Sequence, residues 1–346
     1  MHLSFDRRII INNHNMDLRN YHHVLAFALL ILASGSCGKQ SERVGDSGGF
    51  PADRVVRVSP EVAPQTRGSY TTENLKEFDL FIHSENSKYS YTNTGFTKNT
   101  SGEWVPARQM LWEGKDKGFK FLAVAPPLSK RDVALALTGD IFEFTVESVQ
   151  TAESNASDLL LAGWGLSQYI FPSSELGKFY FNEGKLKLEF SHALSLLKVQ
   201  LTLGTELNHD GVPANNPISE LKISGFQPAV KVSYLGLTPS GDATEIQAYQ
   251  SVWTAATDKT QNSVAIFECI VVPQKMDKFT VNFICGGKPY TYTADVKVNG
   301  KLFPFESGKA YTLPLTVGKD EVIMGSDITA KPWESGNGEG ETLETD

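Results

Sequence analysis

The sequence is poor in the residues that catalytic and metal sites most often use. Of its 346 residues only 3 are Cys and 7 are His, and their spacing matches no zinc-binding pattern. Acidic residues outnumber basic ones, 40 against 32, which gives a formal net charge of −8, and no cluster of Lys and Arg appears. Because nucleic-acid-binding domains carry a basic surface, we predict no nucleic-acid partner.

Long hydrophobic runs are also missing. One apolar run, residues 24–33, is too short to cross a bilayer as a helix. Small residues follow it and lead into Cys37, as in a bacterial lipobox, although Ser34 stands where that motif usually has Leu. We therefore predict a signal peptide over residues 1–36 and lipidation (palmitate) of Cys37, with plain signal cleavage as the alternative. A start at Met16 instead of Met1 would give a signal of ordinary length.

No segment has helical periodicity over three turns, and apolar residues instead alternate with period two. Segments of this kind include residues 78–82, 119–123, 186–190 and 197–203, and such alternation is typical of strands with one buried face. The alternation changes parity between residues 191 and 196, which we interpret as a bulge or bend. Asn299-Gly300 between two strand-like halves predicts a type I′ hairpin.

The strand-like segments recur at the spacing expected of β-sandwiches, with a boundary near residue 184. The fold class that we predict is all-β. The predicted organisation is a signal peptide (1–36), a lipidated tether with an N-terminal strand (37–67), an N-terminal β-sandwich (68–184), a C-terminal β-sandwich (185–334) and a disordered acidic tail (335–346).

The two cysteines of the sandwich region lie in successive strand-like runs. If these runs paired as a hairpin, Cys269 and Cys285 would face each other, and a disulfide would form in an oxidising compartment. Two buried free thiols are equally consistent with the sequence, because the register is not fixed by the pattern.

No arrangement of side chains indicates catalysis, a metal or a cofactor. Ser191 and His192 are adjacent but lack the strand-turn-helix elbow of a nucleophile. We therefore interpret His192 as a structural residue and predict that the protein is not an enzyme. Tyr89, Tyr91 and Trp104 are candidates for stacking on sugars, although cross-strand pairing explains them equally well.

Four segments occur in the order found in one known family. Trp104 and Trp112 precede an aromatic strand that ends at Pro126, and Gln150 precedes the run Asp158-Leu-Leu-Leu-Ala. Residues 188–199 contain the pattern F-x-H-A-L-x-x-x-x-V, and residues 328–333 form a final strand that ends in Trp. Over about residues 67–334 the chain resembles the fimbrillin family, the type V pilins and related lipoproteins of Gram-negative anaerobes.

The resemblance implies two tandem transthyretin-like β-sandwiches, no cofactor and no enzymatic activity. It also implies a structural subunit of cell-surface fimbriae that reaches the outer membrane as a lipoprotein and serves in adhesion. Its expected partners are other pilin subunits, a processing protease and a host or bacterial surface ligand. Two alternatives stay open: a non-polymerising surface lipoprotein that binds glycans, and an accessory anchor or tip pilin.

In such pilins a protease cuts after an Arg and removes the N-terminal strand. Arg67, Arg57 and Arg54 are the candidates here. We rank Arg67 first, because a cut there removes the whole strand-like island at residues 55–58.

The groove left by that cut would be filled by the C-terminal strand of another subunit, which is donor-strand exchange. Residues 321–333 are the candidate donor, with Val322, Met324, Ile328 and Ala330 on one face. The alternative is that this segment completes its own sandwich.

Overall fold

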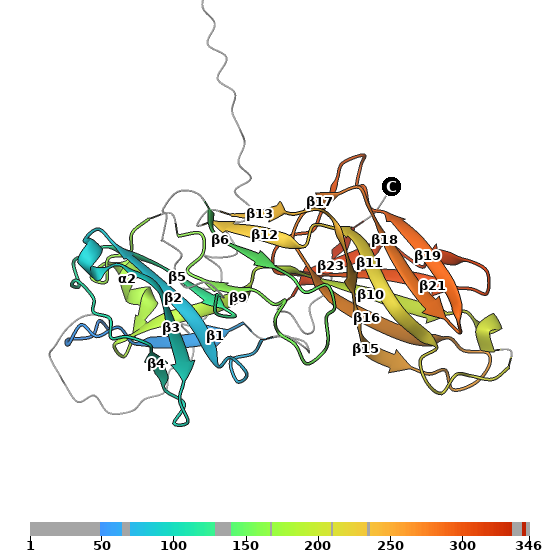
Figure 1. Cartoon of the computed structure of the whole chain (residues 1–346), viewed down its shortest axis with the longest axis horizontal. Coiled ribbons are helices and arrows are strands. Elements are labelled where there is room, and N and C mark those ends of the chain that lie inside the picture. Colours follow the sequence, from blue (N-terminus) through green and yellow to red (C-terminus); the bar gives the residue numbers. More distant parts are fainter. Residues whose placement is uncertain are drawn as a thin grey trace, which may run out of the picture. The chain divides into compact units, whose positions relative to one another are not determined.

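The computed structural model describes residues 49–63, 70–128, 140–166, 168–208, 210–233, 236–333 and 341–343. The chain divides into residues 1–46 and a compact unit from residue 47 to the end. The predicted signal peptide, Cys37 and Arg67 lie outside the described residues. Those residues are nearly all in strands or loops, with one short α-helix, α2 (Glu175–Tyr180), which confirms the all-β prediction (Figure 1). Within the described ranges no helix is long and apolar enough to cross a membrane.

The first sheet has eight strands, all of which lie between residues 58 and 192. Its order is β1 (Val58–Val62), β9 (Lys185–His192), β7 (Leu160–Ala162), β5 (Phe119–Ala125), β2 (Glu77–Ser84), β3 (Tyr91–Lys98) and β4 (Trp104–Pro106), with β8 (Phe181–Asn182) paired to β9. β9 alternates as predicted, since Leu186, Leu188 and Phe190 are buried while Lys185 and Glu189 are exposed. Because β9 belongs to this sheet, the chain leaves it after His192 and not near residue 184.

A core of aromatic residues covers one face of this sheet. Phe78 on β2 stacks on Phe96 of β3 with ring centroids 5.2 Å apart, and Phe190 of β9 meets Phe78 at 5.5 Å. The opposite face of the same strands, represented by Phe81 and Leu122, belongs to the second hydrophobic core. The central strands β2 and β5 are therefore buried on both faces, whereas β9 has one exposed face.

The second core is enclosed by several sheets. The largest has the order β15 (Tyr249–Thr254), β16 (Ser263–Val271), β10 (Ser195–Leu203), β21 (Lys309–Val317), β23 (Ile328–Pro332) and β24 (Glu341–Leu343), with β22 (Val322–Met324) paired to β21. A four-stranded sheet has the order β14 (Thr244–Gln247), β11 (Ile218–Phe226), β18 (Lys278–Cys285) and β19 (Lys288–Asp295). Two smaller sheets comprise β13 (Leu237–Ser240), β12 (Ala229–Ser233) and β6 (Asp140–Thr145), and β17 (Lys275–Met276) with β20 (Phe303–Pro304).

Two local predictions concern the path of the backbone. The Asn299-Gly300 turn is confirmed, because both residues have positive φ (51° and 69°) and Val298 and Lys301 exchange two backbone hydrogen bonds of 3.0 Å. Of the bulge or bend predicted between residues 191 and 196, the structure has the bend, at Leu194. The parity changes there because the chain passes from β9 in the first sheet to β10 in another sheet.

For the two cysteines the structure has the second of the arrangements that the sequence left open, the buried free thiols. Cys269 lies on β16 and Cys285 on β18, and these strands belong to different sheets. Both cysteines are buried free thiols and not a disulfide.

The prediction of a wholly disordered tail needs one correction. Residues 341–343 form β24, which pairs antiparallel with β23. An open strand edge is a template for an extended segment, and the tail supplies one.

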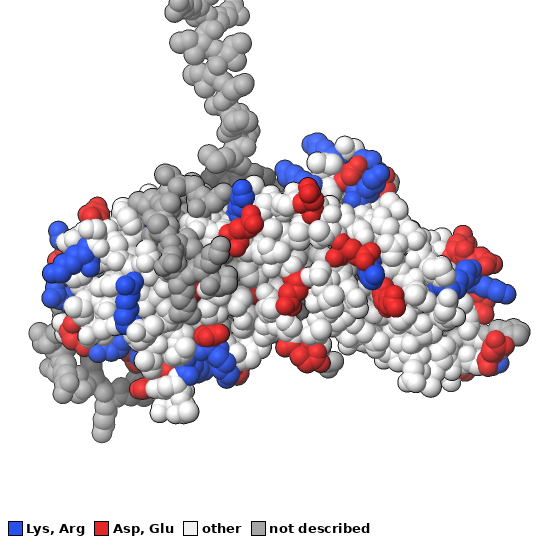
Figure 2. All heavy atoms as spheres, in the orientation of Figure 1, with Lys and Arg blue, Asp and Glu red and all other residues white. Residues whose placement is uncertain are grey.

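Acidic and basic side chains are interspersed on one face of the molecule. On the face that Figure 2 shows, Lys and Arg side chains lie among Asp and Glu side chains without a continuous basic area.

Candidate functional site

β1 is an edge strand held by one neighbouring strand. It pairs in parallel with β9, from Val58 opposite Leu186 to Val62 opposite Phe190. The Leu186 N–H donates to the Arg57 carbonyl at 2.8 Å, and Ala63 N–H donates to the Phe190 carbonyl at 3.1 Å. The side chains of Val58 and Val62 point into the first core. The strand therefore begins slightly later than the predicted island at residues 55–58.

A groove of about 510 Å³ lies along the other edge of β1. Its opposite wall is β4, the strand at the far end of the same sheet, so the curled sheet leaves its two edges facing each other. In the parallel ladder the backbone groups of the odd-numbered residues of β1 bond to β9, so those of the even-numbered residues face the groove. Pro60 is one of the even-numbered residues and has no N–H to offer there. Proline at such a position protects an edge from unwanted pairing.

Two of the three candidate arginines precede β1 and are engaged in local contacts. Arg54 donates from Nη1 to the Glu113 carbonyl at 3.2 Å, and Arg57 forms an ion pair of 2.6 Å with Asp53. The Arg57 guanidinium is the main reason that the pKa of Asp53 is lowered to about 2. A cut at Arg54 or Arg57 would leave β1 attached, whereas a cut at Arg67 would separate β1 from everything that follows.

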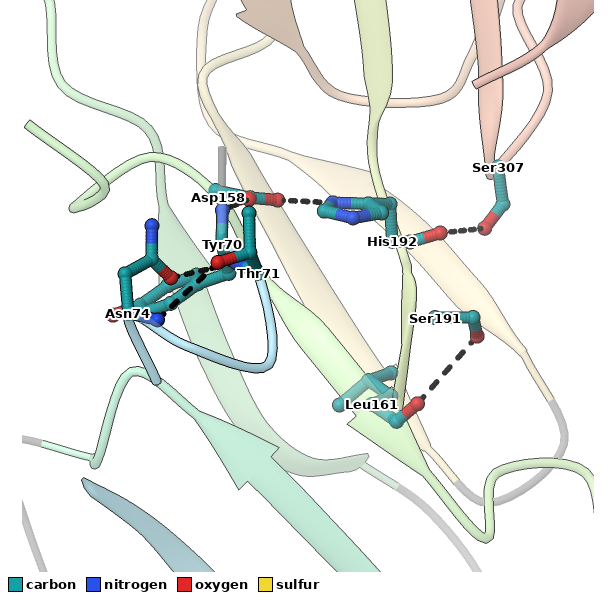
Figure 3. Close-up of polar contacts among 8 residues, drawn as sticks. All are labelled: Tyr70, Thr71, Asn74, Asp158, Leu161, Ser191, His192 and Ser307. Atoms are coloured by element: carbon teal, nitrogen blue, oxygen red, sulfur yellow. Dashed lines mark hydrogen bonds and ion pairs between the residues drawn. The ribbon is translucent and has the colours of Figure 1, made fainter. Parts of the chain in front are cut away.

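Tyr70, which follows the candidate cut at Arg67, is hydrogen-bonded to a buried acidic residue. The backbone N–H of Tyr70 donates to Asp158 Oδ2 at 3.0 Å, and the other carboxylate oxygen of Asp158 lies 2.6 Å from Nδ1 of His192 (Figure 3). Neither the Asp158 nor the His192 side chain has any exposed surface. Burial first, and then the charges of Asp158 and Glu77, raise the pKa of Tyr70 to about 12.

His192 also contacts the end of the last long sheet segment. Its ring centroid lies 4.4 Å from that of Trp333, which is 1% exposed and donates its backbone N–H to the Gly308 carbonyl at 2.7 Å. Ser307 Oγ reaches the His192 carbonyl at 3.5 Å. The Asp158–His192 pair thus joins the start of the segment after Arg67 to the C-terminal strands.

The candidate donor segment lies in the sheet of its own chain. β22 and β23 both pair antiparallel with β21, and the N–H of Gly325 between them donates to the Pro314 carbonyl at 2.9 Å. The four side chains predicted to share a face all contact the second core: Ile328 and Ala330 are buried, and Val322 and Met324 are partly buried. The structure therefore has the arrangement that the sequence left open as the alternative, in which the segment completes its own sheet.

Two of the three aromatic residues suggested for sugar stacking, Tyr91 and Trp104, are engaged in hydrogen bonding or packing. The Tyr91 hydroxyl donates to the Leu111 carbonyl at 3.1 Å and accepts from the Leu111 N–H at 2.9 Å. The Trp104 ring packs on Phe78 at 4.9 Å. In the ranges that the structure describes, no group of three or more His, Cys, Asp and Glu side chains is placed to hold a metal ion.

Comparison with known proteins supplies the family. The fimbrillin-like family matches residues 66–333, which is most of the chain. The chain belongs to the fimbrillin-like family. No curated protein sequence matches it.

Two solved structures have a similar fold. A putative cell adhesion protein from Bacteroides uniformis is 18% identical with a TM-score of 0.52, and the match covers 82% of this chain and 99% of that one. A putative cell adhesion protein from Bacteroides ovatus is 13% identical with a TM-score of 0.53, and covers 86% of this chain and 100% of that one. At such identities the likeness establishes the fold of this family member and not its partners.

Proposed function

We propose that this fimbrillin-like protein is a structural subunit of cell-surface fimbriae, assembled by protease-triggered donor-strand exchange and used in adhesion. The observation that carries the proposal is the position of β1. It is an edge strand that fills part of the first core, and the candidate cut at Arg67 follows it directly in the chain. Non-enzymatic, structural roles are typical of the family.

Loss of β1 would create a strong site for another strand. It would expose the apolar side chains that Val58 and Val62 cover and the backbone groups of β9 that bond to β1. Refilling the groove with two similar side chains is worth roughly 1.5–3 kcal/mol each, in addition to the restored backbone ladder. An extended segment from another subunit satisfies both requirements.

Delivery to the outer membrane would depend on Cys37. A diacylated Cys37 anchors the precursor, and the cut after Arg67 then frees the subunit from its lipid. Cys37→Ala should remove the acyl mass from the N-terminal peptide and release the protein from membranes or block its export. An unchanged membrane association, with no acyl mass on the wild-type peptide, would contradict lipidation.

Residues 321–333 are our candidate donor, and using them requires a rearrangement. β22 and β23 would leave β21 of their own chain and pair with β9 of the next subunit. Because Ile328 and Ala330 are 0% and 2% exposed, this exchange moves already buried side chains from one core to another. The net gain in free energy would come from refilling the groove that the cut opens.

The test compares polymers from four strains that produce the wild type, Arg67→Ala, the matched control Arg54→Ala and a deletion of residues 321–346. We expect SDS-resistant ladders from the wild type and from Arg54→Ala. Arg67→Ala and the deletion should give folded monomers only. Ladders from Arg67→Ala with an unaltered N-terminus would show that this arginine is not the cut site.

The pairing of β22 and β23 with β21 favours a second candidate, an accessory anchor or tip pilin that donates no strand. The same deletion separates the two. If the chain without residues 321–346 fails to fold as a monomer, the segment belongs to its own core. The protein is then better described as a capping, anchoring or non-polymerising surface subunit.

A further inference from the structure

A small pocket of about 130 Å³ lies beside the short helix α2, away from the groove along β1. Its walls combine aromatic and charged side chains on α2, on β9 and in the turn after β7. The lining residues include Phe121, Trp164, Phe179, Tyr180, Lys187 and Glu189.

The apolar walls are fixed by their neighbours. Gly163 has φ of +76°, and a Cβ at this position would lie 2.5 Å from the Phe121 ring, so only glycine allows the turn to approach so closely. Trp164 Nε1 donates to the Ser233 carbonyl at 3.1 Å, which holds the indole in place. The Tyr180 ring meets Phe121 edge-on at 5.6 Å. The pocket is therefore preformed.

The polar groups at the rim carry one charge of each sign. Lys187 and Glu189 are two residues apart on β9 and so point to the same face of the strand. Lys187 Nζ lies 5.0 Å from the centre of the Phe179 ring. Tyr180 and Glu189 line the same pocket. Burial first, and then the charge of Glu189, raises the pKa of Tyr180. Among the described residues these three polar groups have no hydrogen-bond or ion-pair partner.

The polar groups of Tyr180, Lys187 and Glu189 together restrict the class of ligand. The carboxylate of Glu189 would repel an anion and the ammonium of Lys187 a cation, while a purely apolar side chain would leave all three polar groups unpaired. A neutral ring with an apolar face and several hydroxyls pairs with both donors and acceptors and stacks on the aromatic walls. Ligand pockets for larger molecules hold roughly 300–1,000 Å³, so this one accommodates a single ring.

We propose that the pocket formed by Trp164, Phe179, Tyr180, Lys187 and Glu189 is a binding subsite for one ring of a neutral saccharide. The hydroxyl of Tyr180 donates to or accepts from sugar hydroxyls, the carboxylate of Glu189 accepts from them, and the ammonium of Lys187 donates to them. The subsite does not require polymerisation, because every residue in it comes from one chain.

The test uses the purified full chain and the methyl glycosides of glucose, galactose, mannose and N-acetylglucosamine. Binding is measured by saturation-transfer NMR and titration. Tyr180→Phe removes a hydroxyl, and Glu189→Gln replaces a carboxylate by a neutral amide that accepts fewer hydrogen bonds. Phe179→Ala removes a wall residue that is 53% exposed, and none of the three changes should prevent folding. Glu153→Gln, on an exposed turn outside the pocket, is the matched control.

We expect at least one glycoside to bind the wild type and Glu153→Gln equally. Its affinity should fall about tenfold in Glu189→Gln and measurably in the other two variants. Absence of binding to all four glycosides, equal affinity in all variants, or a pocket that takes an apolar peptide but no glycoside would overturn the proposal. None of these outcomes bears on filament assembly, which the ladder experiment decides separately.

Discussion

Replacing Asp158 by Ala should destabilise the protein strongly, because one carboxylate serves two chain segments. Its Oδ1 lies 2.6 Å from His192 Nδ1, and its Oδ2 accepts from the Tyr70 N–H at 3.0 Å. Both side chains of the pair are fully buried. In Asp158→Ala the imidazole and the amide lose their partners at a site that water does not reach.

The magnitude follows from these two losses. Removing one partner of a buried pair costs about 3–5 kcal/mol. The Tyr70 amide, left without its acceptor, adds about 1 kcal/mol. We therefore expect the free energy of unfolding to fall by about 4–6 kcal/mol, which is a large part of the 5–15 kcal/mol typical of a folded protein.

In Asp158→Asn the free energy of unfolding should fall less, by about 1–3 kcal/mol. The amide oxygen still accepts one hydrogen bond, and a neutral imidazole can carry its proton on Nε2 and accept from the new NH₂ group. Asp320→Ala removes an exposed carboxylate that pairs with Lys288, and should leave the unfolding midpoint unchanged.

Urea unfolding followed by tryptophan fluorescence measures the effect, because Trp333 lies 4.4 Å from the His192 ring and reports on this junction. If Asp158→Ala unfolds within about 1 kcal/mol of the wild type, the pair does not join the two segments in the way described here.

Three further predictions concern single residues. Because the pKa of Tyr70 is raised to about 12, the folded state keeps the phenol proton while the unfolded state loses it from about pH 10. The free energy of unfolding should therefore fall as the pH rises from about 10 to about 12. Tyr70→Phe should remove one tyrosine that titrates near pH 12 in the 295-nm absorbance. Burial first, and then the charge of Glu268, raises the pKa of the Cys269 thiol, so a thiol reagent should modify Cys269 only after unfolding. Labelled Cys269 in mass spectra of the native protein would contradict this. Gly163→Ala should cost about 1–3 kcal/mol in thermal or urea unfolding, because its Cβ would overlap the Phe121 ring and backbone, and a neutral effect would mean that the turn can move.

Local features of the fold could be predicted from the sequence because they depend on neighbouring residues. The Asn299-Gly300 turn needs two positive φ angles, and these residues adopt them readily. The alternation in β9 follows from one face of the strand being buried. The parity change after His192 was ambiguous, since a bulge and a crossing between sheets invert the buried face in the same way.

Pairing between distant segments could not be predicted in this way. Cys269 and Cys285 lie in successive long strands, yet β16 pairs with β10 and β18 with β11. The contact between Asp158 and His192 arises because β7 pairs with β9, which sets Leu160 opposite His192. The sequence contained a signal for both residues, since each lies in a segment that resembles the family pattern, but not for their contact.

The most direct test of the proposed function is the N-terminal residue of the protein recovered from purified cell-surface filaments. We expect the protein to be present in the filaments and to begin at Gly68, immediately after Arg67 and without β1. A protein that is absent from filaments, or that is present there with β1 still attached, would contradict assembly by removal of this strand.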